Sequence, residues 1–293
     1  MPIPDSNPIV VAPTPTPFGP DDRVDHDAMA RNVQRLVETP LSGFVLTTAN
    51  GEEQLLSEEE KVELVGTVSS TLGGRLFVIA GIDVPSRTET LRLAERYTKA
   101  GADLVRVRIP RNLSAHEVTS YFQEVTRHSP LPIVVIHQTF SGVPAAPPEA
   151  IGEVCSLDNV YGYITDHDIR FEAYVRPYIQ EDRAFWTCNG GLLAYGMLVG
   201  ANGACMWLGN VAPDLCMQIV RLGFEGRFAE ARELQTIASD LDRVIIQYGT
   251  AGVKAALGLL GFEGMTPRAP VRPVGDTGMR AISEALNGAG LLG

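Results

Sequence analysis

Several side chains that can transfer protons lie at or just after apolar runs typical of strands. His137 ends one such run, and Asp166, His167 and Asp168 directly follow another. An imidazole titrates near neutral pH and is a frequent acid or base, so His137 is the first candidate for proton transfer. The alternative is a histidine that is held in place by hydrogen bonds and takes no part in chemistry. The residue types alone leave both interpretations open.

The acidic residues after the sixth run also have two interpretations. Alternation along a strand places Ile164 and Asp166 on the same face, so Asp166 would point into a pocket if the strand extends that far. With His137 and Asp83 it could orient water, bind a substrate or hold a metal. No HxH or HxxE spacing supports a metal site, and we expect none. The alternative is that Asp166 or Asp168 caps the helix that follows.

Arginines provide candidate anion-binding groups. Arg106 and Arg108 alternate along one run and therefore share a face. On a pocket-lining face they could bind an anionic substrate in a bidentate manner, whereas on the opposite face they would pair with covering helices. Because Val105 and Val107 suit the interior, we expect the arginines to face the helices. Arg111 follows the strand and is the expected carboxylate-binding residue.

The elements that must position these residues alternate regularly. Apolar runs typical of buried parallel strands occupy residues 9–12, 43–47, 76–80, 104–109, 133–137, 161–165, 184–187 and 204–208. Amphipathic stretches between them, such as 27–39, 57–71, 86–100 and 115–128, predict helices. Eight such units predict an α/β fold, a (β/α)8 TIM barrel, whose reacting groups sit at the carboxyl ends of the strands. We expect residues 1–223 to form the barrel and residues 224–293 to form a helical C-terminal extension packed on it.

Composition limits the classes of function. The chain has 293 residues, 45% hydrophobic and 20% charged, and a formal net charge of −11. The acidic balance argues against a nucleic-acid or anionic-membrane surface, and no apolar run is long enough to span a bilayer. Four cysteines without CxxC spacing predict buried free thiols and a cytoplasmic protein.

Several segments, in constant order, resemble the dihydrodipicolinate synthase / N-acetylneuraminate lyase family of (β/α)8 aldolases. They are residues 13–18 (PTPTPF), 43–52 (GFVLTTANGE), 99–103 (KAGAD), 200–203 (GANG), 210–213 (NVAP) and 253–257 (VKAAL). The resemblance implies a lyase that acts on a keto acid and assembles as a homotetramer built from two dimers.

The residues that carry the family's chemistry differ in this chain. The lysine that forms the Schiff base falls on Ile164, and the Thr-Thr pair that binds the keto-acid carboxylate falls on Ala49 and Asn50. The second tyrosine of the PYY motif falls on Asn112, and the tyrosine that serves as general acid/base falls on His137. A Schiff base requires a primary amine, so the family reaction cannot take place at Ile164.

Two functions therefore remain open. One is a lyase that acts on a small keto acid or carboxylate without Schiff-base chemistry and without a cofactor, with His137 and Asp166 as the catalytic residues. Its expected substrate-binding residues are Ala49, Asn50, Arg111, Asn112, Ile164 and His167. The alternative is a catalytically inactive homologue that binds a small molecule or serves a structural or regulatory role. It is supported by Ala49, Gly142 and Ile164, which stand at or near the positions where the resemblance places a threonine, the arginine of an RTG motif and the lysine.

Two further features have more ordinary expected roles. Asn189, Gly190 and Gly191 follow the seventh run and could bring a helix N-terminus to an anion, but a plain turn is the favoured interpretation. Lys254 lies in an apolar helical pattern, which favours a surface or structural lysine over a relocated nucleophile.

Overall fold

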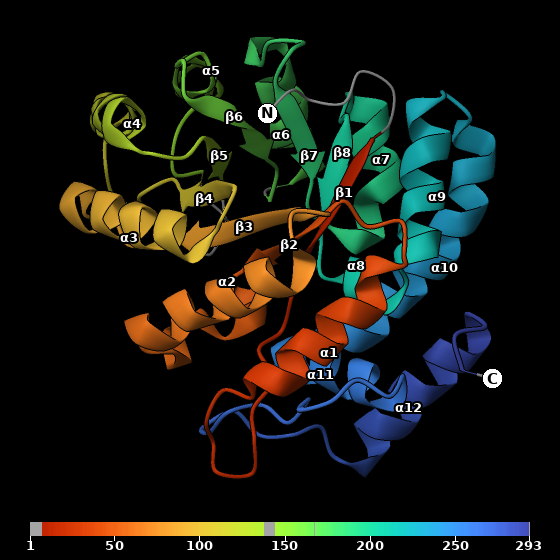
Figure 1. The fold of residues 1–293 in the computed structure, drawn as a ribbon. Coiled ribbons are helices and arrows are strands. Elements are labelled where there is room, and N and C mark those ends of the chain that lie inside the picture. The colour runs from red at the N-terminus through yellow and green to blue at the C-terminus, as the bar shows by residue number, and fades with distance from the viewer. Residues whose placement is uncertain (1–7, 138–143, 167, 293) are drawn as a thin grey trace.

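The chain folds into a closed barrel of eight parallel strands in sequence order. The computed structural model describes residues 8–137, 144–166 and 168–292, and its barrel runs from β1 to β8 and back to β1 (Figure 1). The strands are β1 (Ile9–Pro13), β2 (Gly43–Leu46), β3 (Phe77–Ile82), β4 (Leu104–Arg108), β5 (Ile133–Ile136), β6 (Val160–Ile164), β7 (Ala184–Thr187) and β8 (Gly203–Cys205). The predicted (β/α)8 fold is confirmed.

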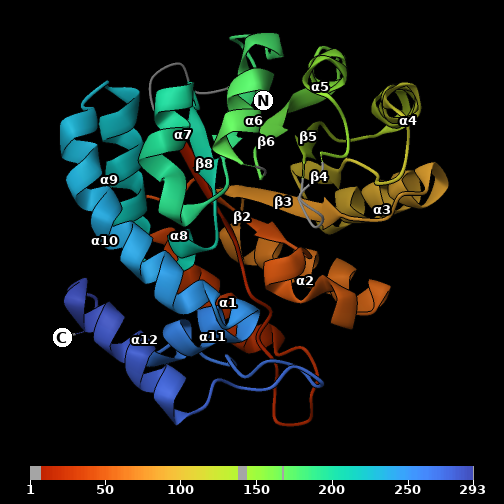
Figure 2. The same ribbon diagram turned by 180° about the vertical axis from the view of Figure 1, so that it is seen from behind.

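Helices cover the outside of this barrel. The covering elements are α1 (His26–Val37), α2 (Glu58–Leu72), α3 (Arg87–Ala100), α4 (Ala115–His128), α5 (Pro148–Cys155), α6 (Ile169–Val175), α7 (Leu193–Val199), α8 (Leu208–Val211) and α9 (Pro213–Phe224). The C-terminal extension consists of α10 (Phe228–Ile246), α11 (Gly249–Leu259) and α12 (Asp276–Gly288). Both views show α10 beside α9 on one flank, with α12 below it (Figure 2). No helix in the described ranges is long and apolar enough to cross a membrane.

Local signals explain where the helices begin and end. At the start of α2, Ser57 and Glu60 form a reciprocal capping box, as the SEEE sequence predicts. The same helix ends at Gly73, whose φ of 57° is left-handed and costs a glycine little. The expected strand bounds differ from the observed ones by one or two residues at several ends, and most at β8, which stops at Cys205 while Leu208 begins the short helix α8.

Two apolar clusters divide the interior. The larger lies between the strands and the helices and includes Val105, Val107 and Tyr163. The smaller fills the barrel lumen and includes Leu104 and Trp186. Because neighbouring residues of a strand point to opposite faces, these clusters reveal which side chains of each strand face the lumen.

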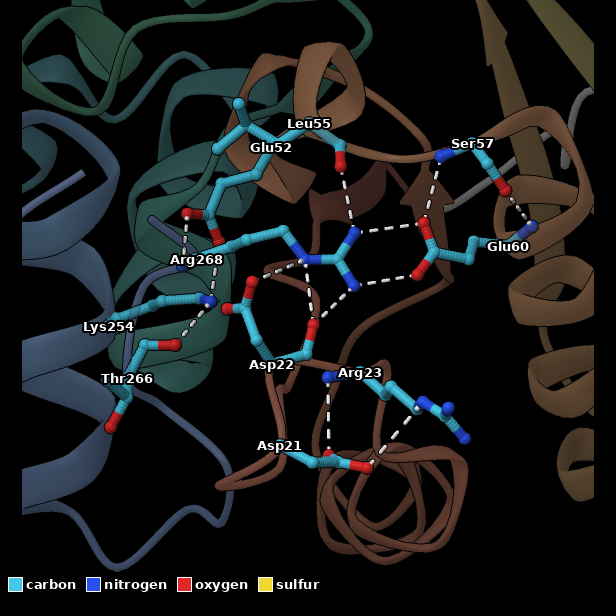
Figure 3. A network of polar contacts seen from close by, with 10 residues as sticks. All are labelled: Asp21, Asp22, Arg23, Glu52, Leu55, Ser57, Glu60, Lys254, Thr266 and Arg268. Carbon is cyan, nitrogen blue, oxygen red and sulfur yellow. Dashed lines mark hydrogen bonds and ion pairs between the residues drawn. The ribbon is translucent and has the colours of Figure 1, made fainter. Parts of the chain in front are cut away.

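A polar network ties the extension to the loop after β2. The side chain of Lys254 is 0% exposed, and its Nζ lies 2.5 Å from Glu52 Oε2 and donates to the Thr266 carbonyl at 3.0 Å (Figure 3). Arg268 adds bonds to the Leu55 carbonyl and to both carboxylate oxygens of Glu60. Lys254 is thus structural, and the network fixes the segment that carries Ala49 and Asn50.

Candidate functional site

A cavity of about 260 Å³ opens at the carboxyl ends of the strands. Its polar side chains come from the loop after β2, from β4, from the ends of β6 and β7 and from α10. They are Thr48, Asn50, Arg106, Asp166, Asn189 and Asp242. Its apolar wall includes Val45, Ile136 and Trp207. Reacting groups of (β/α)8 enzymes lie at this end of the barrel, so the cavity is the candidate site.

Arg106 lies on the lumen side of β4, contrary to the expectation from sequence. Its side chain is 3% exposed and lines the cavity, while Val105 and Val107 pack against the helices. Arg106 Nη2 donates to Asp83 Oδ1 at 2.6 Å, and Arg108 Nη2 donates to Asp83 Oδ2 at 2.7 Å. The expected facing was wrong because a buried carboxylate from the end of β3 compensates the arginines inside the lumen.

A missing side chain on β3 makes room for this arginine. A Cβ on Gly81 would lie 2.9 Å from Thr48 Cγ2 and 3.0 Å from Arg106 Nη2, so these two side chains flank the same point. Asp83 accepts from Nη2, whereas Arg106 Nε and Thr48 Oγ1 are buried without a hydrogen-bond partner among the described residues. Buried donors are normally satisfied, so these two atoms are suited to the oxygen atoms of a bound anion or of water.

Asp166 is a cavity-lining carboxyl whose pKa lies near neutrality. Burial raises its pKa from 3.8 to about 7, and the nearby charges of Arg106 and Arg108, together with a hydrogen bond from Cys188, offset only part of that rise. Near neutral pH the carboxyl is therefore partly protonated, which suits a group that accepts and returns a proton. Its predicted position on the lumen side is the one observed.

His137 does not face the cavity. Ile136 lines it instead, so the next residue points toward the helices. The His137 side chain is 1% exposed, its Nε2 accepts from the Ala145 N–H at 2.8 Å, and its ring packs 5.1 Å from that of Phe171. The expected lumen position of His137 was wrong. The lumen-facing residue at the end of β5 is Ile136, one residue before the position that the resemblance indicated.

The other predicted site residues are divided between the cavity and its surroundings. Ala49 and Asn50 line the cavity. Ile164 lies at the end of β6 within the apolar lumen cluster. Arg111 and Asn112 are exposed beyond β4 and are not among the cavity-lining residues of the described chain. His167 lies outside the described residues, as does Gly142.

The cavity wall contains thiol groups but, among the described residues, no lysine amine. Cys188 and Cys205 line the cavity, and burial raises the pKa of both thiols, that of Cys205 to about 12. Protonated thiols are poor nucleophiles, so these cysteines act as small side chains of the wall. Cys188 is half-buried rather than fully buried as expected.

The extension contributes a residue that sequence reasoning missed. Asp242 of α10 lines the cavity. The signal was present in the spacing of Gln235, Ser239 and Asp242, which places three polar side chains on one face of a helix. Because Asp242 is far from any strand end in the sequence, only the docking of α10 shows its proximity.

Comparisons with known proteins agree with the (β/α)8 fold. The chain matches the Dihydrodipicolinate synthetase family over residues 7–289. It is 27% identical over 274 residues to an N-acetylneuraminate lyase of Rhizobium meliloti, covering 92% of this chain and 91% of the relative. It is 28% identical over 283 residues to a 4-hydroxy-tetrahydrodipicolinate synthase of Bartonella tribocorum, covering 94% and 96%. A solved dihydrodipicolinate synthase from Thermotoga maritima superposes with a TM-score of 0.91 at 24% identity, covering 98% of this chain and 99% of that one, and so shares the fold.

Proposed function

Because the chain belongs to the Dihydrodipicolinate synthetase family, we propose that its cavity takes a small keto acid or carboxylate and acts on it as a lyase without a Schiff base. Relatives named as a lyase and a synthase support chemistry on a small molecule at this end of the barrel. The observation that carries the proposal is that Arg106, whose Nε is buried without a partner among the described residues, and the near-neutral carboxyl of Asp166 line one cavity. Ile164, the position at which the resemblance places the family's lysine, lies in the apolar lumen cluster and has no amine.

The substrate carboxylate occupies the spot between Arg106 and Thr48. Its oxygen atoms accept from Arg106 Nε–H and from the Thr48 hydroxyl, both of which are otherwise unpaired among the described residues. Asp83 accepts from Nη2 of the same guanidinium, so Nε remains available to the ligand. Arg106 thereby binds the carboxylate, a role that the resemblance assigns to the positions of Ala49 and Asn50.

Proton transfer then falls to Asp166. Its carboxylate removes a proton from the carbon next to the substrate carbonyl, the C–H bond breaks, and the electron pair moves onto the carbonyl oxygen as an enolate. Asn50 lines the same cavity and can donate its amide hydrogen to that oxygen. A carboxyl with a pKa near 7 contributes on the order of 10²–10⁴-fold in rate as a general base.

Pyruvate is the probe that tests both roles. Calorimetric titration of wild-type protein should give binding. Arg106→Lys keeps a cation beside Asp83 but has no Nε–H directed at the carboxylate, so it should weaken binding roughly tenfold to a hundredfold. Arg111→Lys, at the exposed arginine outside the cavity, is the matched control and should bind as wild type. Equal affinity of the wild-type and Arg106→Lys proteins would refute the carboxylate site.

The alternative of a binding protein without catalysis is separated by a second measurement. Loss of the pyruvate methyl proton signal in deuterated water reports proton removal directly. Asp166→Asn should retain pyruvate affinity and lose this exchange. Exchange that is absent from wild-type protein, with binding intact, would favour the inactive homologue, for which the apolar side chain of Ile164 in the lumen is the structural argument.

A further inference from the structure

One face of α10 builds a wall of the cavity from outside the barrel. Gln235 Nε2 donates to the Gly190 carbonyl at 3.0 Å, and Ser239 Oγ donates to the Gly191 carbonyl at 3.2 Å. The Ala194 N–H donates to Gln235 Oε1 at 2.7 Å. Asp242 lies two turns along the same face from Gln235, which brings its carboxylate over the loop after β7.

Gly190 and Gly191, the glycine pair after β7, leave the space that the Asp242 carboxylate occupies. A Cβ on Gly190 would lie 2.9 Å from Asp242 Oδ1, and one on Gly191 would lie 3.3 Å from Asp242 Oδ2. A side chain at Gly190 would therefore displace the carboxylate from the cavity. The pair that sequence reasoning favoured as a plain turn is better explained as the space in which Asp242 is held.

The charge of Asp242 is poorly compensated by the protein. Burial raises its pKa to about 6, and the Gly191 N–H offsets only part of that rise. Within the described ranges no arginine, lysine or histidine forms an ion pair with it, and the cavity-lining arginine is engaged by Asp83. A carboxylate in this situation gains from a ligand that donates a hydrogen bond or carries a positive charge.

Arg106 and Asp242 reach the cavity from separate parts of the barrel rim. Arg106 is on β4, while Asp242 reaches the cavity over the loop between β7 and α7, and β7 lies three strands from β4 around the closed barrel. A ligand that contacts both must therefore carry an acceptor at one end and a donor at the other.

We infer that Asp242 is the specificity-determining residue of the cavity and binds the hydrogen-bond-donating end, an ammonium or a hydroxyl group, of a small carboxylate whose other end Arg106 holds. The role of Arg106 in this inference rests on the proposed function, whereas the role of Asp242 rests on the contacts of α10 and on the burial of its carboxylate without an ion-pair partner among the described residues. The substrate class is thus narrowed to short carboxylates with a polar donor group at the far end.

Four four-carbon probes test this inference by calorimetric titration: butyrate, 4-hydroxybutyrate, 4-aminobutyrate and butylamine. Wild-type protein should bind the amino or hydroxy acid roughly tenfold to a hundredfold more tightly than butyrate. Asp242→Ala should reduce either acid to the affinity of butyrate. Asp242→Asn separates the two donors, because an amide oxygen still accepts from a hydroxyl but does not neutralise an ammonium. Asp240→Asn, at an exposed residue of the same helix, is the matched control and should behave as wild type.

The results distinguish a failure of the role of Asp242 from a failure of the carboxylate site at Arg106. If butyrate and its derivatives bind equally, or if Asp242→Ala leaves the preference intact, the role of Asp242 is refuted while the carboxylate site stands. Butylamine bound through Asp242 with none of the acids bound would refute the proposed function and support Asp242. If wild-type protein binds none of the four, both are overturned.

Discussion

The buried carboxyl of Asp166 should make the stability of the protein depend on pH in a predictable direction. Its pKa is raised from 3.8 to about 7 in the folded protein because burial disfavours the charged form. The folded state therefore holds this proton more tightly than the unfolded state does. The resulting stabilisation is fully present below the unfolded pKa and is lost as pH rises through about 7.

The size of the effect follows from the two pKa values. A shift of one unit corresponds to about 1.4 kcal/mol, so the full shift of about three units is worth on the order of 4 kcal/mol. Only part of it falls between about pH 5 and about pH 8, where linkage gives a loss on the order of 2–3 kcal/mol. Asp166→Asn removes the titration with little change of shape, so the variant should lack this loss.

Urea unfolding of the two proteins at the two pH values measures the difference. The free energy of unfolding of wild-type protein should fall relative to that of Asp166→Asn as pH rises, by the amount above. Other groups, including Asp242, titrate in both proteins and cancel in the comparison. Asp182→Asn, at an exposed residue before β7, should follow wild type. Parallel pH profiles for wild type and Asp166→Asn would show that the carboxyl is not desolvated, and the assignment of a proton-transfer role to it would lose its basis.

Three further outcomes are expected. Borohydride treatment with pyruvate should leave the protein mass unchanged, because Ile164 has no amine and no lysine of the described chain lines the cavity; mass spectrometry showing a reduced adduct would contradict this. Lys254→Met should lower the free energy of unfolding by about 3–5 kcal/mol, because it leaves Glu52 buried without its cation, whereas Lys99→Met at an exposed site should change it little in the same urea assay. Light scattering should give the mass of a homotetramer; a particle of 31.6 kDa would refute that assembly.

Properties that depend on local sequence were predictable. The eight apolar runs fixed the strand count, and the serine and glutamate of the α2 capping box marked a helix start that the structure reproduces. These signals work because hydrophobic periodicity and side-chain capping act over a few residues. The position of Asp166 on the lumen side also followed from strand alternation.

The sequence did not predict for every strand which face points into the barrel lumen. Along β4 the sequence alternates between valine and arginine, and either set can face the lumen if the other is compensated. Valine seemed the inward choice because burying a guanidinium is costly without a partner. The partner, Asp83, lies on another strand, and only closure of the barrel brings the two within 2.6 Å.

Two other placements required the tertiary structure for related reasons. His137 was assigned to the lumen by a resemblance one residue out of phase, and a period of two means that such a shift turns the side chain to the opposite face. Asp242 reaches the cavity only because α10 docks on the loop after β7. The sequence by itself therefore determined the fold and the end of the barrel where chemistry belongs. Which charged groups face one another there was decided by strand register and helix docking, since both arise from contacts between residues far apart in the chain.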